Sequence, residues 1–409
     1  MRQLPVRDRR TADNFHWFQS ARQQRQSVEM KSTNMSNRQL YLDNLRIYLT
    51  ILVILHHASL TYGGSGDWVG DGDLVDPAVD AISSFLFPIF NVINQSYFMS
   101  AFFLLAGYFT PRSFDRKGSW HFLKDRLIRL GIPILIYTTI IININAYMLD
   151  AFRGSSYLLR VRYEPGHLWF LQALLIFAVM YMIFRALADR IAPKKRIQLY
   201  RGSFPPDAVL VLFISIIAIL TFTVRLVFPV GVWFLAIQPG HFVHYIFCFY
   251  IGVLAYRGDW FEGLSKKQAH RWGIISLVVI PLFFVMGILG GVLEDPEKYV
   301  GFLLGGPHWQ ALAYAVWESF LMVGVLVFLL YFFRERLNKA GPVAESMAVN
   351  VYTVYIIHLT ILVALQILFL PIGIPTILKF FFVSLIAVIL CFSLSILIRR
   401  IPYARRVLG

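Results

Sequence analysis

The sequence has only two cysteines among its 409 residues, and both lie within apolar segments. Cys248 and Cys391 therefore indicate neither a disulfide framework nor a cysteine-based metal site. The chain also lacks a Walker-type phosphate loop, a glycine-rich dinucleotide fingerprint and an internal repeat. These absences argue against a pump driven by nucleotide hydrolysis.

Acidic residues are scarce, with 23 Asp and Glu against 38 Lys and Arg and a formal net charge of +15. Such a balance can indicate nucleic-acid binding, but most of these cations lie in the two tails and in alternate loops between apolar segments. Residues 63–80 show the converse, with several aspartates and neither Lys nor Arg. This asymmetry follows the positive-inside rule of membrane proteins, so we expect no nucleic-acid partner.

Polar residues are also too few for a water-soluble globule, since 57% of residues are hydrophobic and the mean hydropathy is +0.62. A membrane helix needs about 20 mostly apolar residues, and the sequence contains ten such segments. They lie near 45–62, 82–109, 128–149, 168–187, 207–228, 241–257, 272–292, 309–333, 347–369 and 376–398. The sequence therefore predicts an all-α polytopic membrane protein with about ten transmembrane helices and no soluble domain of useful size.

The tails indicate the orientation of this protein. An even number of helices and the basic ending "RRIPYARR" predict that both termini are cytoplasmic. Residues 1–40 are polar and basic without the apolar core of a signal peptide, so we expect a disordered cytoplasmic tail. The ten-helix domain then spans 41–400, and 401–409 form a short basic tail. This organisation predicts a multi-pass protein of the cytoplasmic (inner) membrane, in contact with membrane lipid.

The first apolar segment carries ionisable side chains in "DNLRIYLTILVILHHASLTYG", residues 43–63. Such groups are costly inside a membrane unless they face a cavity or a partner, which makes them functional candidates. Arg46 and His57 are separated by about three helical turns, so they share nearly one face and lie roughly 16 Å apart along the axis. His56 is rotated by about 100° from that face. Alternatively, Arg46 extends toward the membrane surface and both histidines close the far end of the helix.

A second basic pair, Arg126 and Arg129, lies in "DRLIRLGIP" at the start of the third segment. Two arginines one helical turn apart at a membrane boundary can bind a phosphate group. Ordinary positive-inside anchoring explains the same pair without any ligand.

Five stretches together resemble the acyltransferase 3 family of polytopic membrane proteins. They are "YLDNLRIYLTILVILHH", "FFLLAGYFTPRS", "DRLIRLGIP", "GHLWFL" and "VYIIHL". The family includes O-acetyltransferases of bacterial surface polysaccharides and a glucan-modifying succinyltransferase group, to which "YLDNLR" and "FFLLAGYF" are most similar. The resemblance extends over nearly everything after residue 40.

The resemblance implies roles for four of these residues. The family pattern of a basic residue, ten residues and a histidine matches Arg46 and His57, and its Arg-x-x-Arg pattern matches Arg126 and Arg129. It further implies a cytoplasmic acyl-CoA donor, whose phosphates suit the arginine pair, and an acceptor on the opposite side of the membrane.

We therefore expect an O-acyltransferase that moves an acetyl or succinyl group from acyl-CoA to a hydroxyl of an extracytoplasmic carbohydrate or lipid-linked acceptor. His57 would act as a general base toward that hydroxyl, or it would itself carry the acyl group. No bound cofactor is expected. The alternative is a transporter of a sugar, lipid or acylated metabolite, which would not consume acyl-CoA.

A base needs an orienting group, and Glu318 is the acid placed deepest in a predicted span. Its depth in the segment 309–333 matches that of His57 within roughly 6 Å at 1.5 Å per residue. We therefore predict a catalytic contact between Glu318 and His57. The alternative partner for Glu318 is another buried polar group such as Arg225.

The remaining candidates lie near the outer ends of the segments. His167 and Trp169 in "EPGHLWFLQ" could contact the acceptor, although an interfacial Trp is more often a membrane anchor. Arg153, with Arg160 and Arg162, could bind an anionic acceptor or a lipid headgroup, or form salt bridges with local acids. The scattered His241, His244 and His308 do not suggest a metal site, and none is expected. His358 in "VYIIHL" is assigned to helix packing.

Overall fold

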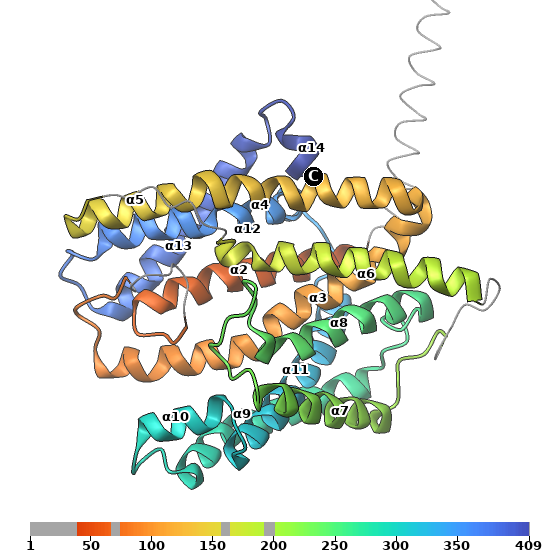
Figure 1. Ribbon diagram of the computed structural model, residues 1–409, viewed down its shortest axis with the longest axis horizontal. Coiled ribbons are helices and arrows are strands. Elements are labelled where there is room, and N and C mark those ends of the chain that lie inside the picture. The colour runs from red at the N-terminus through yellow and green to blue at the C-terminus, as the bar shows by residue number, and fades with distance from the viewer. Residues whose placement is uncertain (1–38, 67–73, 157–163, 192–200, 409) are drawn as a thin grey trace, which may run out of the picture.

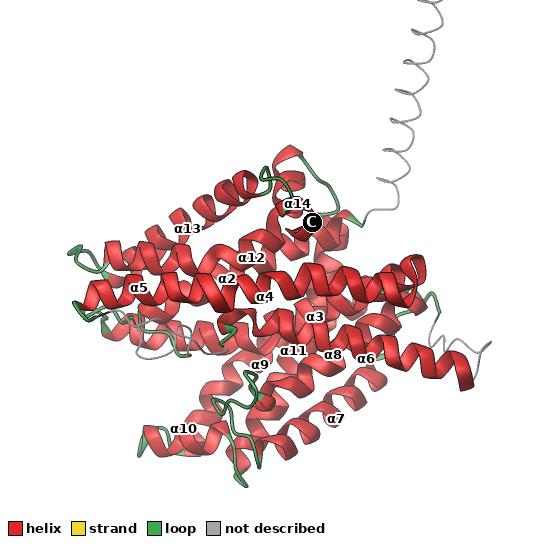
Figure 2. Cartoon of the chain, turned by 45° about the horizontal axis from the view of Figure 1, so that its top comes forward, coloured by secondary structure: helices red, strands yellow, loops and turns green. Residues whose placement is uncertain are grey.

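The computed structural model describes residues 39–66, 74–156, 164–191 and 201–408. Over these residues the chain is built from helices, which confirms the predicted all-α class, and loops lie at the helix ends (Figure 2). The predicted N-terminal tail falls outside the described residues.

The helices follow one another with short connections, as Figure 1 shows. The α-helices are α2 (Leu40–Thr61), α3 (Ala81–Arg126), α4 (Ile132–Ile136), α5 (Ile142–Arg153), α6 (Trp169–Ile191), α7 (Asp207–Arg225), α8 (Pro239–Gly258), α9 (Lys266–Gly290), α10 (Pro296–Leu304), α11 (Trp309–Arg336), α12 (Pro342–Phe369), α13 (Thr376–Ile398) and α14 (Ala404–Leu408). Two π-helical turns, η1 (Leu127–Gly131) and η2 (Tyr137–Ile141), flank α4, and a 3₁₀ turn, η3 (Gly166–Leu168), precedes α6.

Residues 110–127, which the sequence suggests as a basic loop, are almost entirely helical in the structure. The chain reverses at one residue, Gly118, whose φ of 70° and ψ of 166° break the helix. A positive φ is strained for residues with a Cβ atom, so glycine suits this turn. Figure 1 shows the chain crossing the molecule along α3 and returning in the opposite direction through α4 and α5.

In the described part of the chain, seven helical runs are long and apolar enough to cross a membrane. They are Ala81–Arg153, Gly166–Ala188, Asp207–Arg225, Lys266–Gly290, Trp309–Arg336, Pro342–Phe369 and Thr376–Ile398. The first of these runs contains the reversal at Gly118 and therefore consists of two helical parts. Helices α2 and α8 are not among the seven. The chain is therefore a multi-pass membrane protein, and the count of ten spans with both termini inside stays a prediction.

The central helices are α11 and α12, whose apolar windows are each 61% buried within the protein, against 17% for α9. Around them α3 packs along α8, α9 along α11, and both α2 and α13 pack against α12. The large exposed hydrophobic side chains of α7, α9 and α13 face outward, as lipid-facing surfaces do. The functional candidates on α2 and α12 consequently lie in the interior of the helix assembly.

A buried ion pair fastens the loop between α2 and α3 to α13. Lys379 donates a hydrogen bond to Oδ1 of Asp76 at 3.1 Å and another to the carbonyl oxygen of Leu370 at 3.0 Å. The backbone N–H of Asp76 donates to the carbonyl oxygen of Thr61, at the end of α2. A lysine inside a membrane needs such partners, so these contacts explain how Lys379 can be buried there.

Candidate active site

Helix α2 presents a polar face that contains both predicted residues. It is helical throughout Leu40–Thr61, so Arg46, Thr50, Val53 and His57 lie on nearly one side. The Thr50 hydroxyl donates to the carbonyl oxygen of Arg46 at 2.8 Å, and Nδ1 of His57 lies 2.9 Å from the carbonyl oxygen of Val53. Arg46, which is partly exposed, forms an ion pair with Asp43 at 3.6 Å.

The adjacent histidines face different helices. His56 is buried, accepts a hydrogen bond from the Asn91 side chain of α3 at 3.2 Å, and stacks on Phe98. His57 is half-buried, and its Nδ1 lies 3.3 Å from Nε2 of His358 on α12. The two rings therefore have separate surroundings, as the helical geometry predicts.

A histidine cluster forms where α2, α12 and the start of α6 meet, and we define it as His57, His167 and His358. The rings of His167 and His358 pack edge-on with centroids 4.7 Å apart. Nδ1 of His358 and Nε2 of His167 lie 2.7 and 3.1 Å from the same carbonyl oxygen, that of Tyr355. Of the three histidines only His57 is half-buried, because His167 and His358 are 6% and 0% exposed.

The position of His167 depends on the turn before it. Gly166 has a φ of 49°, and a Cβ atom there would lie 2.8 Å from the hydroxyl oxygen of Tyr137. Glycine alone relieves both the strain and the clash, which lets the Tyr137 ring pack edge-on against His167. The Tyr355 hydroxyl also donates to the carbonyl oxygen of His167. His167 is therefore held inside the helix assembly.

Sequence reasoning assigned His358 to packing and so missed its contact with His57. The available signal was the cost of a fully buried ionisable side chain within a membrane helix. The partner could not be read from the sequence, because α2 and α12 are separated by most of the chain.

Trp169 opens α6 and lies in an aromatic group rather than against lipid alone. Its ring stacks on Tyr245 of α8, with centroids 5.6 Å apart, and contacts Phe242 and Phe103. Tyr245 in turn accepts a hydrogen bond from Gln95 of α3 at 3.1 Å. Trp169 is therefore a half-buried ring beside hydroxyl and amide groups.

The predicted contact between Glu318 and His57 is wrong. Glu318 accepts a hydrogen bond from Nη2 of Arg225 at 2.7 Å, and its Oε1 lies 3.6 Å from Nδ1 of His241. The alternative considered from the sequence, Arg225, is the partner observed. Both side chains are almost fully buried, at 0% and 2% exposure, and a buried carboxylate is far more stable beside a guanidinium than beside a neutral imidazole.

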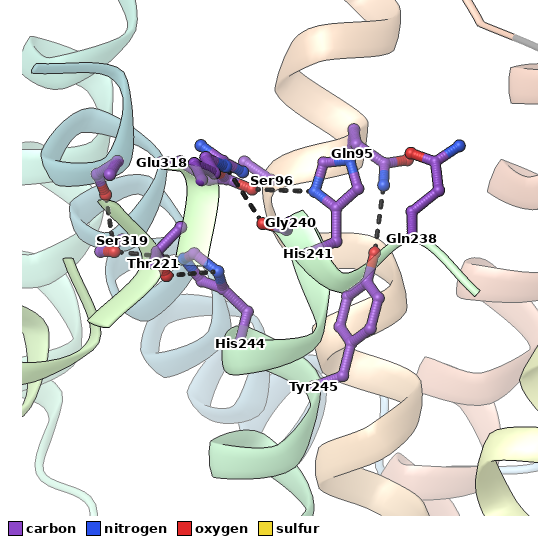
Figure 3. Close-up of polar contacts among 12 residues, drawn as sticks. Gln95, Ser96, Thr221, Gln238, Gly240, His241, His244, Tyr245, Glu318 and Ser319 are labelled. Carbon is purple, nitrogen blue, oxygen red and sulfur yellow. Dashed lines mark hydrogen bonds and ion pairs between the residues drawn. The ribbon is translucent and has the colours of Figure 1, made fainter. Parts of the chain in front are cut away.

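Figure 3 shows the surroundings of this pair, the Arg225–Glu318 cluster, defined as Arg225, Glu318, His241 and His244. Nε of Arg225 donates to the carbonyl oxygen of Gly240, and its guanidinium lies over the Tyr314 ring. His244 lies 3.1 Å from the Ser319 hydroxyl and 3.4 Å from that of Thr221. These contacts join α7, α8 and α11.

Neither cluster has the geometry of a metal site. Within the described ranges, no group of three or more His, Cys, Asp or Glu side chains could hold a metal ion. An imidazole side chain can transfer a proton or attack as a nucleophile, and both reactions are considered for the histidine cluster.

The arginine pair lies where α3 passes into η1. The guanidinium of Arg126 lies 5.1 Å from the centre of the Phe122 ring, while Nε of Arg129 lies 3.4 Å from Asp125. The Tyr352 hydroxyl of α12 donates to the carbonyl oxygen of Arg129. The two arginines share neighbours, because Asp125 and Tyr352 interact electrostatically with both of them.

Arg153 lies in the last turn of α5 and is exposed. Arg160 and Arg162 fall outside the described residues. The contribution of Arg153 to acceptor binding therefore stays a prediction.

Comparisons with known proteins show which family and which proteins this chain is similar to. Residues 39–396 match the model of a family described as "Acyltransferase domain" (acyltransferase 3). The chain is similar to glucans biosynthesis protein C of Escherichia coli K12, with 28% identity over 156 residues, and of Escherichia coli O1:K1 / APEC, with 27% over the same length. Each alignment covers 36% of this chain and 38% of the relative's length. No solved structure matches the chain.

Proposed function

This chain belongs to the acyltransferase 3 family, and we propose that it transfers an acetyl or succinyl group from cytoplasmic acyl-CoA to a hydroxyl of an extracytoplasmic carbohydrate. Family membership and the helical structure make it a membrane acyltransferase. The name of its relatives, glucans biosynthesis protein C, suggests a glucan as the acceptor class. A lipid-linked sugar has the same hydroxyl chemistry.

The observation that carries the proposal is the placement of His57. It is a half-buried imidazole inside the helix assembly, on the same face of α2 as Arg46 and beside a second histidine. A sugar hydroxyl is a poor nucleophile at neutral pH, and an imidazole can remove its proton as its oxygen attacks the thioester carbonyl carbon. The C–S bond then breaks, and the CoA thiolate takes up the proton.

An acyl-imidazole route uses the same residue. In that route a nitrogen of His57 attacks the thioester carbonyl carbon, the C–S bond breaks and CoA leaves as its thiolate. The sugar hydroxyl then attacks the acyl carbon, the bond between that carbon and the ring nitrogen breaks, and the hydroxyl proton passes to the CoA thiolate. Both routes place the reacting centre at His57 and need donor and acceptor to approach it from opposite ends of α2. Arg46 would guide the donor along α2 toward His57.

We assign the donor phosphates to Arg126 and Arg129, which lie at the junction of α3 and η1. Replacing both by alanine should raise the KM for acyl-CoA on the order of tenfold or more, since each charge-assisted hydrogen bond contributes about 1.5–3 kcal/mol. The measurement is initial rate against acyl-CoA concentration. The control is Lys124→Ala, an exposed neighbouring cation.

An acyl-pantetheine donor, which lacks most of the phosphates, should show a smaller difference between wild type and the double variant. An unchanged KM for acyl-CoA would remove the donor assignment and leave the two arginines as membrane anchors.

For the acceptor we propose the aromatic surface of Trp169 and Tyr245, with His167 behind it and Arg153 farther out. A sugar ring on Trp169 would lie close to the histidine cluster because His167 is two residues away and packs on His358. Gln95 and His241, near Tyr245, offer hydrogen-bonding groups for further hydroxyls.

The function is tested with purified protein in liposomes of known orientation. Labelled acetyl-CoA or succinyl-CoA is supplied on the predicted cytoplasmic face, and a glucan oligosaccharide is enclosed on the other. We expect release of free CoA that depends on the glucan, together with label on the glucan. Movement of glucan or acyl group across the membrane without CoA release would show a transporter instead.

A further inference from the structure

The hydrogen bonds of the histidine cluster determine which nitrogen of each ring carries the proton. Each neutral imidazole has one N–H donor and one acceptor nitrogen, and a carbonyl oxygen can only accept. Nδ1 of His358 lies 2.7 Å from the carbonyl oxygen of Tyr355, so Nδ1 carries the proton. Nε2 of His358 is then an acceptor, and it points at His57.

The same reasoning applies to His57. Its Nδ1 lies 2.9 Å from the carbonyl oxygen of Val53 and 3.3 Å from Nε2 of His358. Both neighbours are acceptors, so the proton of His57 is on Nδ1. Nε2 of His57 is left with its lone pair, and it forms no hydrogen bond with any residue in the described part of the chain.

His56 provides an internal comparison. Its Nδ1 accepts a hydrogen bond from the Asn91 amide, so the proton of its ring is on Nε2. The adjacent histidines of α2 thus hold opposite tautomers. Of these two residues, His57 is the one whose Nε2 can act as a base.

We propose that His358 is a positioning residue that holds His57 in the Nδ1–H tautomer, so that Nε2 of His57 is the atom that reacts. This inference rests on the proposed function, since it names the reacting atom of the same site. When Nε2 takes the hydroxyl proton, the ring becomes an imidazolium whose Nδ1–H still donates to His358. When the proton passes to the CoA thiolate, the ring returns to its starting tautomer.

His167 supports the arrangement from the other side. Its Nε2 lies 3.1 Å from the Tyr355 carbonyl oxygen, which therefore accepts from two histidines at once. The Tyr355 hydroxyl donates to the His167 backbone, closing a loop of contacts between α12 and η3. His358 is thus held on both sides, which suits a group whose task is to fix the orientation of a neighbour.

The test uses three substitutions of His358 in the full-length protein in liposomes. His358→Gln places an acceptor oxygen near the position of Nε2, His358→Asn keeps a donor near Nδ1 only, and His358→Leu keeps neither. Loss of a residue that orients a metal-ligating histidine typically costs about 10–100-fold, and we take the same scale for a residue that orients a catalytic histidine. We expect kcat to fall on the order of tenfold to a hundredfold for Asn and Leu, with the KM for acyl-CoA unchanged and with recovery in Gln. Equal losses in all three variants would overturn the proposal.

A second measurement reports on the tautomer itself. In ¹⁵N-histidine-labelled protein, nitrogen NMR distinguishes an N–H from a bare nitrogen, and His57→Ala identifies the signals of His57. We expect Nδ1–H with a bare Nε2 in wild type and a mixture in His358→Leu. A protonated Nε2 in neutral wild-type His57 would refute the role of His358. Because this readout needs no turnover, it separates failure of this inference from failure of the proposed function.

Discussion

We expect His57→Ala to abolish acyl transfer and His56→Ala to retain much of it. This is the largest activity difference that we predict between neighbouring substitutions. General base catalysis contributes typically 10²–10⁴-fold, so transfer by His57→Ala should fall by roughly a hundredfold or more. His56 is directed at Asn91 and Phe98 of α3 and takes no part in the histidine cluster. The measurement is glucan-dependent CoA release in oriented liposomes.

The two substitutions are matched in size and lie on the same turn, so differences in membrane insertion are small. His56 is buried, and its loss can lower stability through the cavity it leaves, so rates are divided by the amount of folded protein. Similar mild losses in both variants would contradict the assignment of His57, as would full loss in a folded His56→Ala.

The helices themselves were the most predictable part of this fold. Apolar runs of about 20 residues are required by the membrane, and each predicted segment coincides with a helix in the structure. The helical structure of residues 110–127 was missed because basic, polar residues such as these are typical of loops. They are equally compatible with a helix that extends beyond the apolar region.

Partner identity within the site was less predictable, and Glu318 shows why. Its expected depth along α11 was compared with that of His57, but depth is only one coordinate. Which helix faces which depends on packing around the assembly, and α7 rather than α2 brings its cation to Glu318. The sequence contained both possible partners, Arg225 and His57, without the geometry needed to choose between them.

His358 illustrates a second limit. The face of α2 could be derived from helical periodicity, because Arg46 and His57 lie on one element. The contact of His57 with His358 joins residues that are about three hundred positions apart, and nothing local in either segment specifies it. Local periodicity thus selected His57 as a candidate, whereas its contact with His358 could be found only in the structure.

The Arg225–Glu318 pair leads to the second large effect, which is on stability. Glu318→Leu leaves a fully buried guanidinium without its carboxylate, and removing one partner of a buried pair costs about 3–5 kcal/mol. We expect little folded protein from this variant. Combining it with Arg225→Met should restore much of the loss, because two apolar side chains of similar volume need no charge compensation.

The restoration should be incomplete for a reason visible in the structure. Nε of Arg225 also donates to the carbonyl oxygen of Gly240, and that acceptor loses its donor in the double variant. A buried polar group left without a partner costs about 1–3 kcal/mol, so the double variant should fall between wild type and Glu318→Leu. Thermal unfolding of the purified proteins in detergent measures this order of stability. The double-mutant cycle compares wild type, Glu318→Leu, Arg225→Met and the double variant.

The same variants separate a structural role of Glu318 from the catalytic role expected from the sequence. If Glu318 holds α7, α8 and α11 together, the folded fraction of the double variant should transfer acyl groups at a rate close to that of wild type. If Glu318 acts on the reacting imidazole, that folded fraction should stay inactive although its stability has returned. Because Arg225, and not His57, is the hydrogen-bond partner observed for Glu318, we expect activity to return together with the fold.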